Sequence, residues 1–386
     1  MSTVGILGGG QLARMLVLAG APLGIRFAVF DPAADACAGQ VAPLQVGAFD
    51  DVATLAAFAG QVDVITFDFE NVPAASAQQL AAQVPVFPSP AALAVAQDRL
   101  SEKTLFRELG IPVPEFAAID DRVGLDAALA RIGTPCVLKT RRFGYDGKGQ
   151  FRIKTLADAD AAWDALGAQA AHVGLIVEAF VPFQREVSVV AVRGRDGEFR
   201  AWPLTENWHV DGVLSASLAP ASLAPASVEA ALQASAESHA RAVAEKLDYV
   251  GVFALELFVR DGELLANEMA PRVHNSGHWT IEGAETSQFE NHVRAVLGLP
   301  LGSTAMRGHA CMLNWLGAMP EARAFLAVPG GHWHDYGKQA RDGRKVGHAT
   351  LRAETAQALA LAVSDAGAAL QRDAQARPVV ARLNEG

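Results

Sequence analysis

Residues 252–280 read VFALELFVRDGELLANEMAPRVHNSGHWT, and this stretch decides the fold of the chain. Its first part predicts a strand from Val252 to Val259, because apolar side chains fill both faces, as in a strand that is covered on each side. A second apolar run at 264–269 follows the pair Asp261-Gly262, which is typical of a tight hairpin turn. We therefore expect two antiparallel strands joined at this turn.

The predicted hairpin carries one carboxylate on each strand, Glu256 and Glu268. Antiparallel pairing can bring the two together, and a carboxylate among buried aliphatic groups needs a cation or strong donors. With the amide oxygen of Asn267 they offer the hard oxygen ligands that Mg²⁺ prefers. The alternative is a buried ion pair between one of the glutamates and Arg272, and the hairpin sequence alone leaves both open.

Donor side chains follow the second strand directly, in the run Arg272, His274, Asn275 and Ser276. A guanidinium group matches a planar, carboxylate-like anion with two parallel hydrogen bonds. The possible cation site therefore lies beside a cluster that can bind an anion.

The composition limits the class of protein. A chain of 386 residues is long enough for two or three domains. Its net charge of −10 provides no general field for nucleic acid or an anionic membrane, so local donors must bind any anion. Cys37, Cys136 and Cys311 are widely spaced and predict buried, unreactive thiols. A first strand at 3–7 without a basic leader, and no long apolar run, lead us to expect a cytoplasmic protein.

The N-terminal segment predicts a β-α-β unit. A strand at 3–7 leads into the glycine turn and helix GGGQLARM at 8–15, and the next strand ends at Asp31. This spacing matches the dinucleotide fingerprint, in which glycines bring the backbone close to a phosphate, although a tight turn without a ligand would look the same. Glu70 and Asn71 follow another strand of this unit, at the edge where α/β sheets bind ligands.

A second glycine-rich segment, FGYDGKGQ at 143–150, lies between strands predicted at 135–140 and 150–153. Its three glycines and its lysine form a loop rich in exposed N–H groups, which can close over phosphates. It is not a Walker A loop, because the residue order of that loop is absent. A hairpin without a ligand is the alternative, but it would carry an excess of cations.

Two later segments add weaker signals. The short tandem SLAPASLAPAS at 217–227 predicts a surface linker. After about residue 305 a third unit contains the densest basic patch of the chain, from Lys338 to Lys345, for which a solvated turn is the alternative. His332 and His334 lie two apart on a predicted strand, where packing is favoured over a metal site because no third ligand is near.

The glycine loop, the paired glutamates and the N-terminal glycine turn all suit phosphates, whereas hydride transfer would explain only the last. Together with the basic patch, these features resemble the ATP-grasp superfamily and, within it, the N5-carboxyaminoimidazole ribonucleotide synthetases. The motifs that carry the resemblance lie in family order along almost the whole chain: GGGQLARM at 8–15, FGYDGKGQ at 143–150, NEMAPRVHNSGHWT at 267–280 and DGRKVGH at 342–348. Asp342 stands where the family usually has proline, which is a turn residue as well.

The resemblance implies an α/β (α+β) chain with the ATP-grasp fold. A Rossmann-like pre-ATP-grasp domain would span 1–97, the ATP-grasp domain 98–304 with a lid at about 112–182, and a small β-rich C-terminal domain 305–386. The implied reaction uses ATP, Mg²⁺ and bicarbonate to carboxylate 5-aminoimidazole ribonucleotide through carboxyphosphate. A homodimer and a separate mutase that receives the product are further family expectations, since no mutase domain is appended.

The resemblance also implies roles for individual positions. The ATP site would comprise Arg99, Lys139, Gly144, Tyr145, Asp146, Gly147, Lys148, Gly149, Gln150, Glu178, Ala179, Phe180, Val181, Glu186, His209, Asn267 and Glu268. Glu256 and Glu268 would hold Mg²⁺. Substrate contacts would come from Gln11, Leu12, Glu70, Tyr145, Asp146, Arg272, Lys338, Arg344 and Lys345. The catalytic groups would be Arg272, His274, Asn275, Ser276, Asp146 and Lys338, with His274 and Asp146 as candidate proton handlers.

Three other functions stay open at this point. A nicotinamide-dependent oxidoreductase would rest only on residues 5–31. Another ATP-grasp carboxylate-amine ligase would share the nucleotide site, although the run HNSGHWT is specific. A nucleotide-sensing protein would keep the fold without turnover, and the intact pair Glu256 and Glu268 argues against it.

Overall fold

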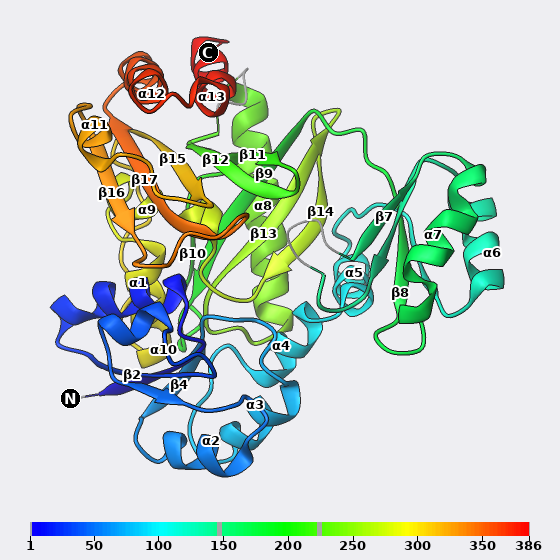
Figure 1. Ribbon diagram of the computed structural model, residues 1–386, viewed down its shortest axis with the longest axis horizontal. Helices are drawn as coiled ribbons and strands as arrows, with labels where there is room; N and C mark the ends of the chain where they lie inside the picture. Colours follow the sequence, from blue (N-terminus) through cyan, green and yellow to red (C-terminus); the bar gives the residue numbers. More distant parts are fainter. Residues whose placement is uncertain (1, 145–148, 222–225, 386) are drawn as a thin grey trace.

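The computed structural model describes residues 2–144, 149–221 and 226–385. The strands of these residues form three sheets, and the largest sheet occupies the centre of the molecule (Figure 1). The N-terminal sheet lies below it in this view, and a small sheet stands to its right.

Four parallel strands in the order β3-β2-β1-β4 form the N-terminal sheet. The strands are β1 (Thr3–Leu7), β2 (Arg26–Asp31), β3 (Leu44–Val46) and β4 (Val64–Phe67). The helices of this part are α1 (Gln11–Gly20), α2 (Val52–Ala59), α3 (Ala74–Ala81) and α4 (Pro90–Ala96). Every residue of β4 is buried, as expected of a parallel sheet covered on both faces. Gly8 and Asp68 directly follow the carboxyl ends of β1 and β4, and both line the same pocket.

The central sheet has nine strands, eight of which run in the order β14-β13-β9-β11-β12-β15-β17-β16, while β10 pairs with β9. Its first part comprises β9 (Arg185–Arg193), β10 (Phe199–Ala201), β11 (Thr205–Val210), β12 (Val213–Ala219), β13 (Gly251–Arg260) and β14 (Glu263–Ala270). The helices that accompany it are α5 (Arg99–Glu108), α8 (Ala226–Lys246), α9 (Thr280–Gly283) and α10 (Gln288–Leu297). Helix α8 packs an alanine-rich face on this sheet, with Ala236 and Ala240 fully buried.

The predicted hairpin is present as β13 and β14. Asp261 and Gly262 join the strands with φ angles of 53° and 80°, the positive values that a tight two-residue turn requires. Glu256 pairs directly with Glu268, but the next pair is Leu257 with Ala266. Asn267 is therefore one extra residue on β14, and such a β-bulge changes the direction of the side chains beside it.

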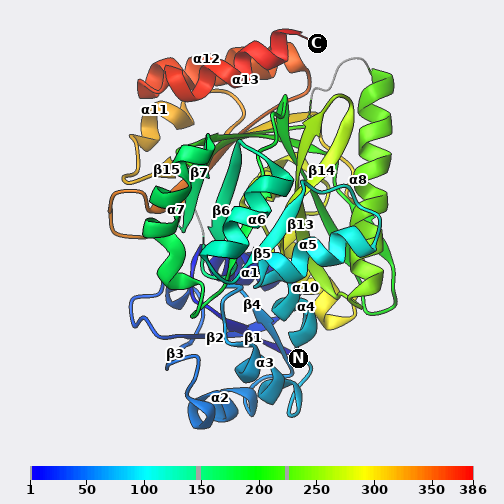
Figure 2. The same cartoon turned by 90° about the vertical axis from the view of Figure 1, so that its right-hand side faces the viewer.

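Four antiparallel strands in the order β5-β8-β6-β7 form the small sheet, which we call the lid sheet. It consists of β5 (Phe116–Ile119), β6 (Cys136–Thr140), β7 (Gln150–Ile153) and β8 (Leu175–Ala179), with α6 (Arg122–Ile132) and α7 (Ala159–Leu166). Figure 2 shows the lid sheet and its helices in front of the central sheet. The glycine-rich segment connects β6 and β7, and its residues 145–148 lie outside the described ranges.

The C-terminal part extends the central sheet with β15 (His309–Leu316), β16 (Gly331–Asp335) and β17 (Lys345–Ala353). These strands were expected, but the long helices that cover them, α12 (Ala356–Leu370) and α13 (Asp373–Glu385), were not part of the prediction. A short helix, α11 (Ala322–Leu326), lies beside them. Because β15 pairs with β12, the C-terminal strands share one sheet with the ATP-grasp strands.

The prediction of a surface linker at 217–227 is wrong for its first part. Ser217 and Leu218 belong to β12 and are fully buried, and Ala221 is buried as well. The prediction was wrong because small and apolar residues are found both in linkers and in buried strands, so composition does not distinguish the two. Residues 222–225 lie outside the described ranges. Among the helices that are described, none is long and apolar enough to cross a membrane.

Candidate active site

A cleft lies between the lid sheet and the β13–β14 hairpin. Its volume is about 590 Å³, within the range of about 300–1,000 Å³ that is usual for ligand pockets. It is lined by most of the predicted ATP site: Arg99, Lys139, Gln150, Glu178, Ala179, Phe180, Val181, Glu186, His209, Asn267 and Glu268. A smaller hollow adjoins this cleft, and the two share Arg99, Glu256 and Glu268. Gly144 lines the hollow, whereas Gly149 lines neither the cleft nor the hollow. The remaining predicted residues, Tyr145, Asp146, Gly147 and Lys148, are outside the described residues.

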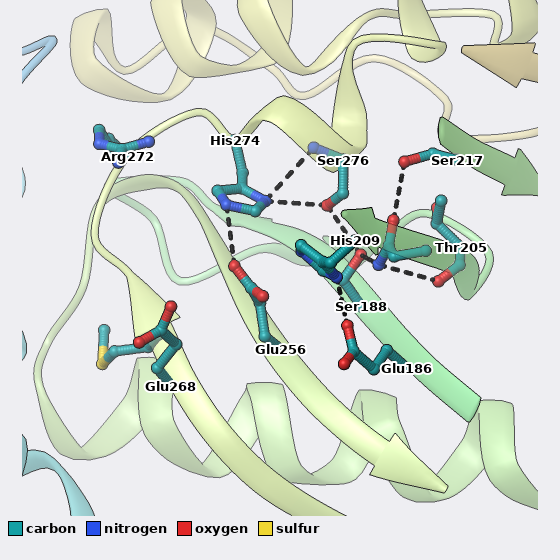
Figure 3. A network of polar contacts seen from close by, with 12 residues as sticks. Glu186, Ser188, Thr205, His209, Ser217, Glu256, Glu268, Arg272, His274 and Ser276 are labelled. Atoms are coloured by element: carbon teal, nitrogen blue, oxygen red, sulfur yellow. Dashed lines mark hydrogen bonds and ion pairs between the residues drawn. The ribbon is translucent and has the colours of Figure 1, made fainter. Parts of the chain in front are cut away.

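The paired carboxylates lie in this cleft, as predicted. Figure 3 shows Glu256 and Glu268 on neighbouring strands, with both carboxylates on the same side of the hairpin. Asn267 would face the opposite side in a regular strand, but the β-bulge lets Asn267 and Glu268 line the same cleft. Three oxygen donors therefore face one space.

The partners of these carboxylates differ from the predicted ion pair. Glu268 accepts a hydrogen bond from Arg99 at 2.7 Å, and Glu256 lies 3.0 Å from Nε2 of His274. Arg272 pairs with Glu70 instead, and it lies apart from the hairpin carboxylates (Figure 3). The alternative that Arg272 neutralises Glu256 or Glu268 is therefore wrong for this structure.

The electrostatics of Glu256 suit a divalent cation. Burial raises the pKa of this carboxyl, but His274, which donates a hydrogen bond to it, together with His209 and Lys345 outweighs burial, and the pKa falls to about 2. The group is thus ionised at neutral pH. Among the described residues no cluster of three or more His, Cys, Asp or Glu side chains could hold a metal by itself. An ion here would need further oxygens, and Mg²⁺ is commonly bound by one or two carboxylates together with substrate phosphates.

A buried charge cluster supports the far side of the cleft. Oε2 of Glu178 lies 3.0 Å from Nζ of Lys139 and 3.4 Å from Nζ of Lys103, and the Lys103 side chain is fully buried. Burial raises the pKa of Glu178, but Lys103 and then Lys139 outweigh it and lower the pKa to about 2. The other oxygen, Oε1, is buried and has no hydrogen-bond partner among the described residues. It can therefore accept a hydrogen bond from a ligand in the cleft.

A second pocket, of about 580 Å³, lies between the N-terminal sheet and the hairpin. Its lining contains several predicted substrate and catalytic residues: Gln11, Leu12, Glu70, Arg272, His274, Asn275 and Lys345. Glu70, His274, Asn275, Arg272 and Lys345 also line the hollow that reaches Glu256 and Glu268. This hollow therefore connects the two pockets, and the carboxylate pair lies in it.

The glycine turn before α1 is already filled by the protein itself. The carboxylate of Asp68 accepts hydrogen bonds from the backbone N–H groups of Gly10 and Ala13, at the end of the helix where a dinucleotide phosphate would bind. Asp31, in the position of the ribose-binding acid, accepts from the N–H of Gly9 at 2.6 Å. These internal contacts give the physical reason why the fingerprint misleads here.

The basic patch contributes unequally to the second pocket. Lys345 lines that pocket, whereas Lys338 and Arg344 line a neighbouring hollow. Lys338 donates a hydrogen bond to the side chain of Gln11, which connects the two hollows. All three cations therefore lie at the part of the site that the N-terminal residues line. His334, which was expected to pack, stacks on His348 with ring centroids 4.2 Å apart.

Three buried charges near the site were missed at the sequence level: Asp68, Glu102 and Lys103. Asp68 follows β4 directly, so its position at a strand end was a usable signal. Burial raises its pKa to about 6, against the opposing effect of Arg272. Glu102 and Lys103 share the buried face of α5 with Phe106, which follows them by four and three residues respectively. That spacing indicates a buried face, although charged side chains rarely occupy one.

The fold and its cleft define the ATP-grasp class, and family models match the chain in three segments. An ATP-grasp domain matches residues 104–289, a ribonucleotide synthetase preATP-grasp domain matches 1–97, and a phosphoribosylaminoimidazole carboxylase C-terminal domain matches 310–361. Together these segments cover most of the chain.

Whole-length relatives narrow the class. The N5-carboxyaminoimidazole ribonucleotide synthase of Pseudomonas aeruginosa is 53% identical over 349 residues, which are 90% of this chain and 94% of the relative. The synthetase structure from Thermus thermophilus superposes with a TM-score of 0.90 at 53% identity, covering 95% of this chain and 98% of the other. The Aspergillus clavatus synthase in complex with ADP and 5-aminoimidazole ribonucleotide gives 0.84 at 30% identity, over 100% and 99% of the chains. The chain belongs to the N5-carboxyaminoimidazole ribonucleotide synthase family.

Proposed function

We propose that this chain catalyses the ATP-dependent carboxylation of 5-aminoimidazole ribonucleotide by bicarbonate, a step of purine biosynthesis. ADP, phosphate and N5-carboxyaminoimidazole ribonucleotide are the products. The observation that carries the proposal is that one hollow, which contains the carboxylate pair and Arg272, connects two pockets. A nucleotide fits the cleft under the lid sheet, a ribonucleotide fits the pocket at the N-terminal sheet, and Arg272 lies where they join.

The chemistry requires this arrangement. Bicarbonate is a poor electrophile, and phosphorylation by ATP turns one of its oxygens into a good leaving group. The resulting carboxyphosphate hydrolyses readily, so it must form next to the amine that attacks it or the CO₂ released from it. Arg272 can hold the anion with two parallel hydrogen bonds between the two nucleotides. His274 and Asn275 follow it in the same segment and line the same hollow, where they supply further donors. The predicted catalytic residue Ser276 is buried behind them, and its hydroxyl bonds His274 and Ser188 instead.

We assign the nucleotide contacts as follows. Arg99 and Lys139 reach the phosphates, and Glu186 accepts from the ribose hydroxyls. The strand end at 178–181 receives adenine, and the unpaired Oε1 of Glu178 accepts from its exocyclic amine. Lys103 keeps Glu178 ionised when Lys139 turns toward a phosphate. A guanine would present a carbonyl oxygen to this carboxylate, so the site favours ATP.

Glu256, Glu268 and Asn267 fit Mg²⁺ by their chemistry and by their common orientation toward the cleft. These three residues would hold the ion, and when bound it would offset the charge that develops on the phosphates during transfer. Arg99, now paired with Glu268, would then be available to the phosphates.

On the substrate side, Lys338, Arg344 and Lys345 would bind the 5′-phosphate of the ribonucleotide, close to Gln11 and Leu12. Glu70 and Asp146 would contact the aminoimidazole, with Asp146 as the candidate acceptor of the amine proton. We further propose a cytoplasmic homodimer that passes its product to a separate mutase, as in the family it belongs to. The boundaries near residues 97 and 304 are proposed on the same basis.

ADP release tests the proposal. We expect release that requires both bicarbonate and aminoimidazole ribonucleotide, because phosphorylation and amine attack occur in one closed site. A coupled assay with each substrate omitted in turn measures this dependence. Release without the ribonucleotide at the full rate, or tight binding of NADH without binding of ATP by calorimetry, would contradict the proposal. The second result would favour the oxidoreductase that the N-terminal fingerprint suggested.

A further inference from the structure

A chain of hydrogen bonds leads from the carboxylate pair into the central sheet (Figure 3). The distances are 3.0 Å from Glu256 Oε1 to His274 Nε2, 2.9 Å from His274 Nδ1 to Ser276 Oγ, 2.7 Å from Ser276 Oγ to Ser188 Oγ, 3.0 Å from Ser188 Oγ to Asn207 Nδ2, and 2.7 Å from Asn207 Oδ1 to Ser217 Oγ. Ser188 and Ser217 are fully buried, and Asn207 is 6% exposed. The proposed reaction gives Ser188, Asn207 and Ser217 no role.

The inner end of this chain fixes the direction of its hydrogen bonds. The backbone carbonyl of Thr205, which can only accept, lies 3.4 Å from Nδ2 of Asn207. The amide nitrogen must therefore face Thr205 and Ser188, while Oδ1 accepts from Ser217. Ser188 accepts a hydrogen bond from the amide of Asn207, so its own O–H donates to Ser276. The O–H of Ser276 is then left to donate to Nδ1 of His274.

The outer end selects the same form of His274. The carboxylate of Glu256 only accepts, so Nε2 must carry the proton that faces it. The backbone N–H of Ser276 lies 3.4 Å from Nδ1 and only donates, so Nδ1 must be bare. Two independent sets of contacts therefore require one neutral tautomer, with the proton on Nε2.

We propose that Asn207 is a positioning residue which, through Ser188 and Ser276, holds His274 in the neutral tautomer protonated on Nε2. His274 is then an N–H donor, first to Glu256 and then to the anion bound by Arg272. With Nε2 protonated and Nδ1 bonded to Ser276, it does not accept the proton of the substrate amine. The tautomer follows from the contacts alone, whereas its use in catalysis rests on the proposed function.

The variant Asn207→Asp tests the direction of these hydrogen bonds, because aspartate has almost the same size and shape as asparagine. An ionised aspartate can only accept, so Ser188 must donate to it, Ser276 must turn toward Ser188, and Nδ1 of His274 becomes free to carry the proton. When protonated, the same carboxyl mimics the amide. We expect kcat to fall on the order of tenfold to a hundredfold as the new carboxyl ionises, with less than about twofold change in KM for ATP. Nitrogen NMR of labelled histidine in the ligand-free protein should show Nδ1 gaining a proton over the same pH range.

A matched control is Asn291→Asp, the same change in another asparagine, which is fully buried. The side-chain amide of Asn291 donates a hydrogen bond to the carbonyl of Gly302 and accepts one from its N–H. It should lower stability and leave the His274 spectrum as it is. Asn207→Leu removes the hydrogen bonds at every pH, and we expect severalfold lower kcat. Wild-type kcat and an unprotonated Nδ1 in both variants at position 207 would overturn the proposal, and so would a wild-type spectrum in which Nδ1 carries the proton. An altered tautomer with normal kcat would instead refute only its use in catalysis.

Discussion

Replacing Arg272 by alanine should lower bicarbonate-dependent turnover on the order of 10³-fold, while the affinity for ADP changes little. A positioned arginine that offsets charge during phosphoryl transfer contributes about that much or more. Arg272 lies at the junction of the two pockets, and Glu70 holds its guanidinium there. Alanine removes the anion donor but none of the residues that line the nucleotide cleft. Steady-state kinetics and calorimetry with ADP measure the two effects separately.

Arg352→Ala is the matched control for this loss. Arg352 also pairs with a glutamate, Glu354, but at the C-terminal part of the sheet, away from both pockets. We expect its turnover to stay within about twofold of the wild type, since such exposed pairs contribute little to stability. If Arg272→Ala carboxylates at the wild-type rate, the bicarbonate pocket is misplaced. If it also loses ADP binding, Arg272 serves the nucleotide.

The substitution Glu268→Gln should abolish the effect of Mg²⁺ on nucleotide binding and lower kcat by about 10²-fold or more. Groups that merely support a metal ligand already cost about 10–100-fold when they are changed, and a ligand should cost at least as much. Glutamine keeps the size of the side chain but removes the charge that faces Glu256 and the partner of Arg99. Calorimetry with ADP at increasing Mg²⁺ measures the metal effect, and the coupled assay measures kcat.

Glu198→Gln serves as its control, because Glu198 pairs with Arg200 beyond the end of β9 that is opposite to the cleft residue Glu186. Its response to Mg²⁺ should equal that of the wild type. Should Glu268→Gln bind ADP with an unchanged dependence on Mg²⁺, the hairpin carboxylates would not be the metal site. The main role of Glu268 would then be its ion pair with Arg99.

The hairpin could be predicted from the sequence because a local signal determines its turn. Asp261-Gly262 fixes the turn and a register in which Arg260 pairs with Glu263, but this register alone would place Asn267 opposite Glu256. The β-bulge brings Glu268 there instead. The β-bulge at Asn267 could not be predicted in this way, since no local signal marks one extra residue in a ladder. The sequence pointed to the right oxygen donors, and only the structure explains why three of them face one cleft.

The partners of charged residues were harder to predict than their positions. Arg272 pairs with Glu70, which is distant in the sequence, and that choice depends on how the N-terminal sheet meets the hairpin. The same holds for Lys103 and Glu178, which come from a helix and a lid strand. The prediction of a linker was wrong at 217–221 for another reason, because residues of small size and low polarity suit both a linker and a sheet interior.

The most direct test of the account follows an oxygen atom from bicarbonate into phosphate. If ATP phosphorylates bicarbonate and the amine attacks the carbon or the CO₂ released, the released phosphate keeps one oxygen of bicarbonate. With ¹⁸O-labelled bicarbonate, in a reaction stopped before the label exchanges with water, we predict one labelled oxygen in each phosphate released with the carboxylated product. Product that forms with unlabelled phosphate would contradict the central claim.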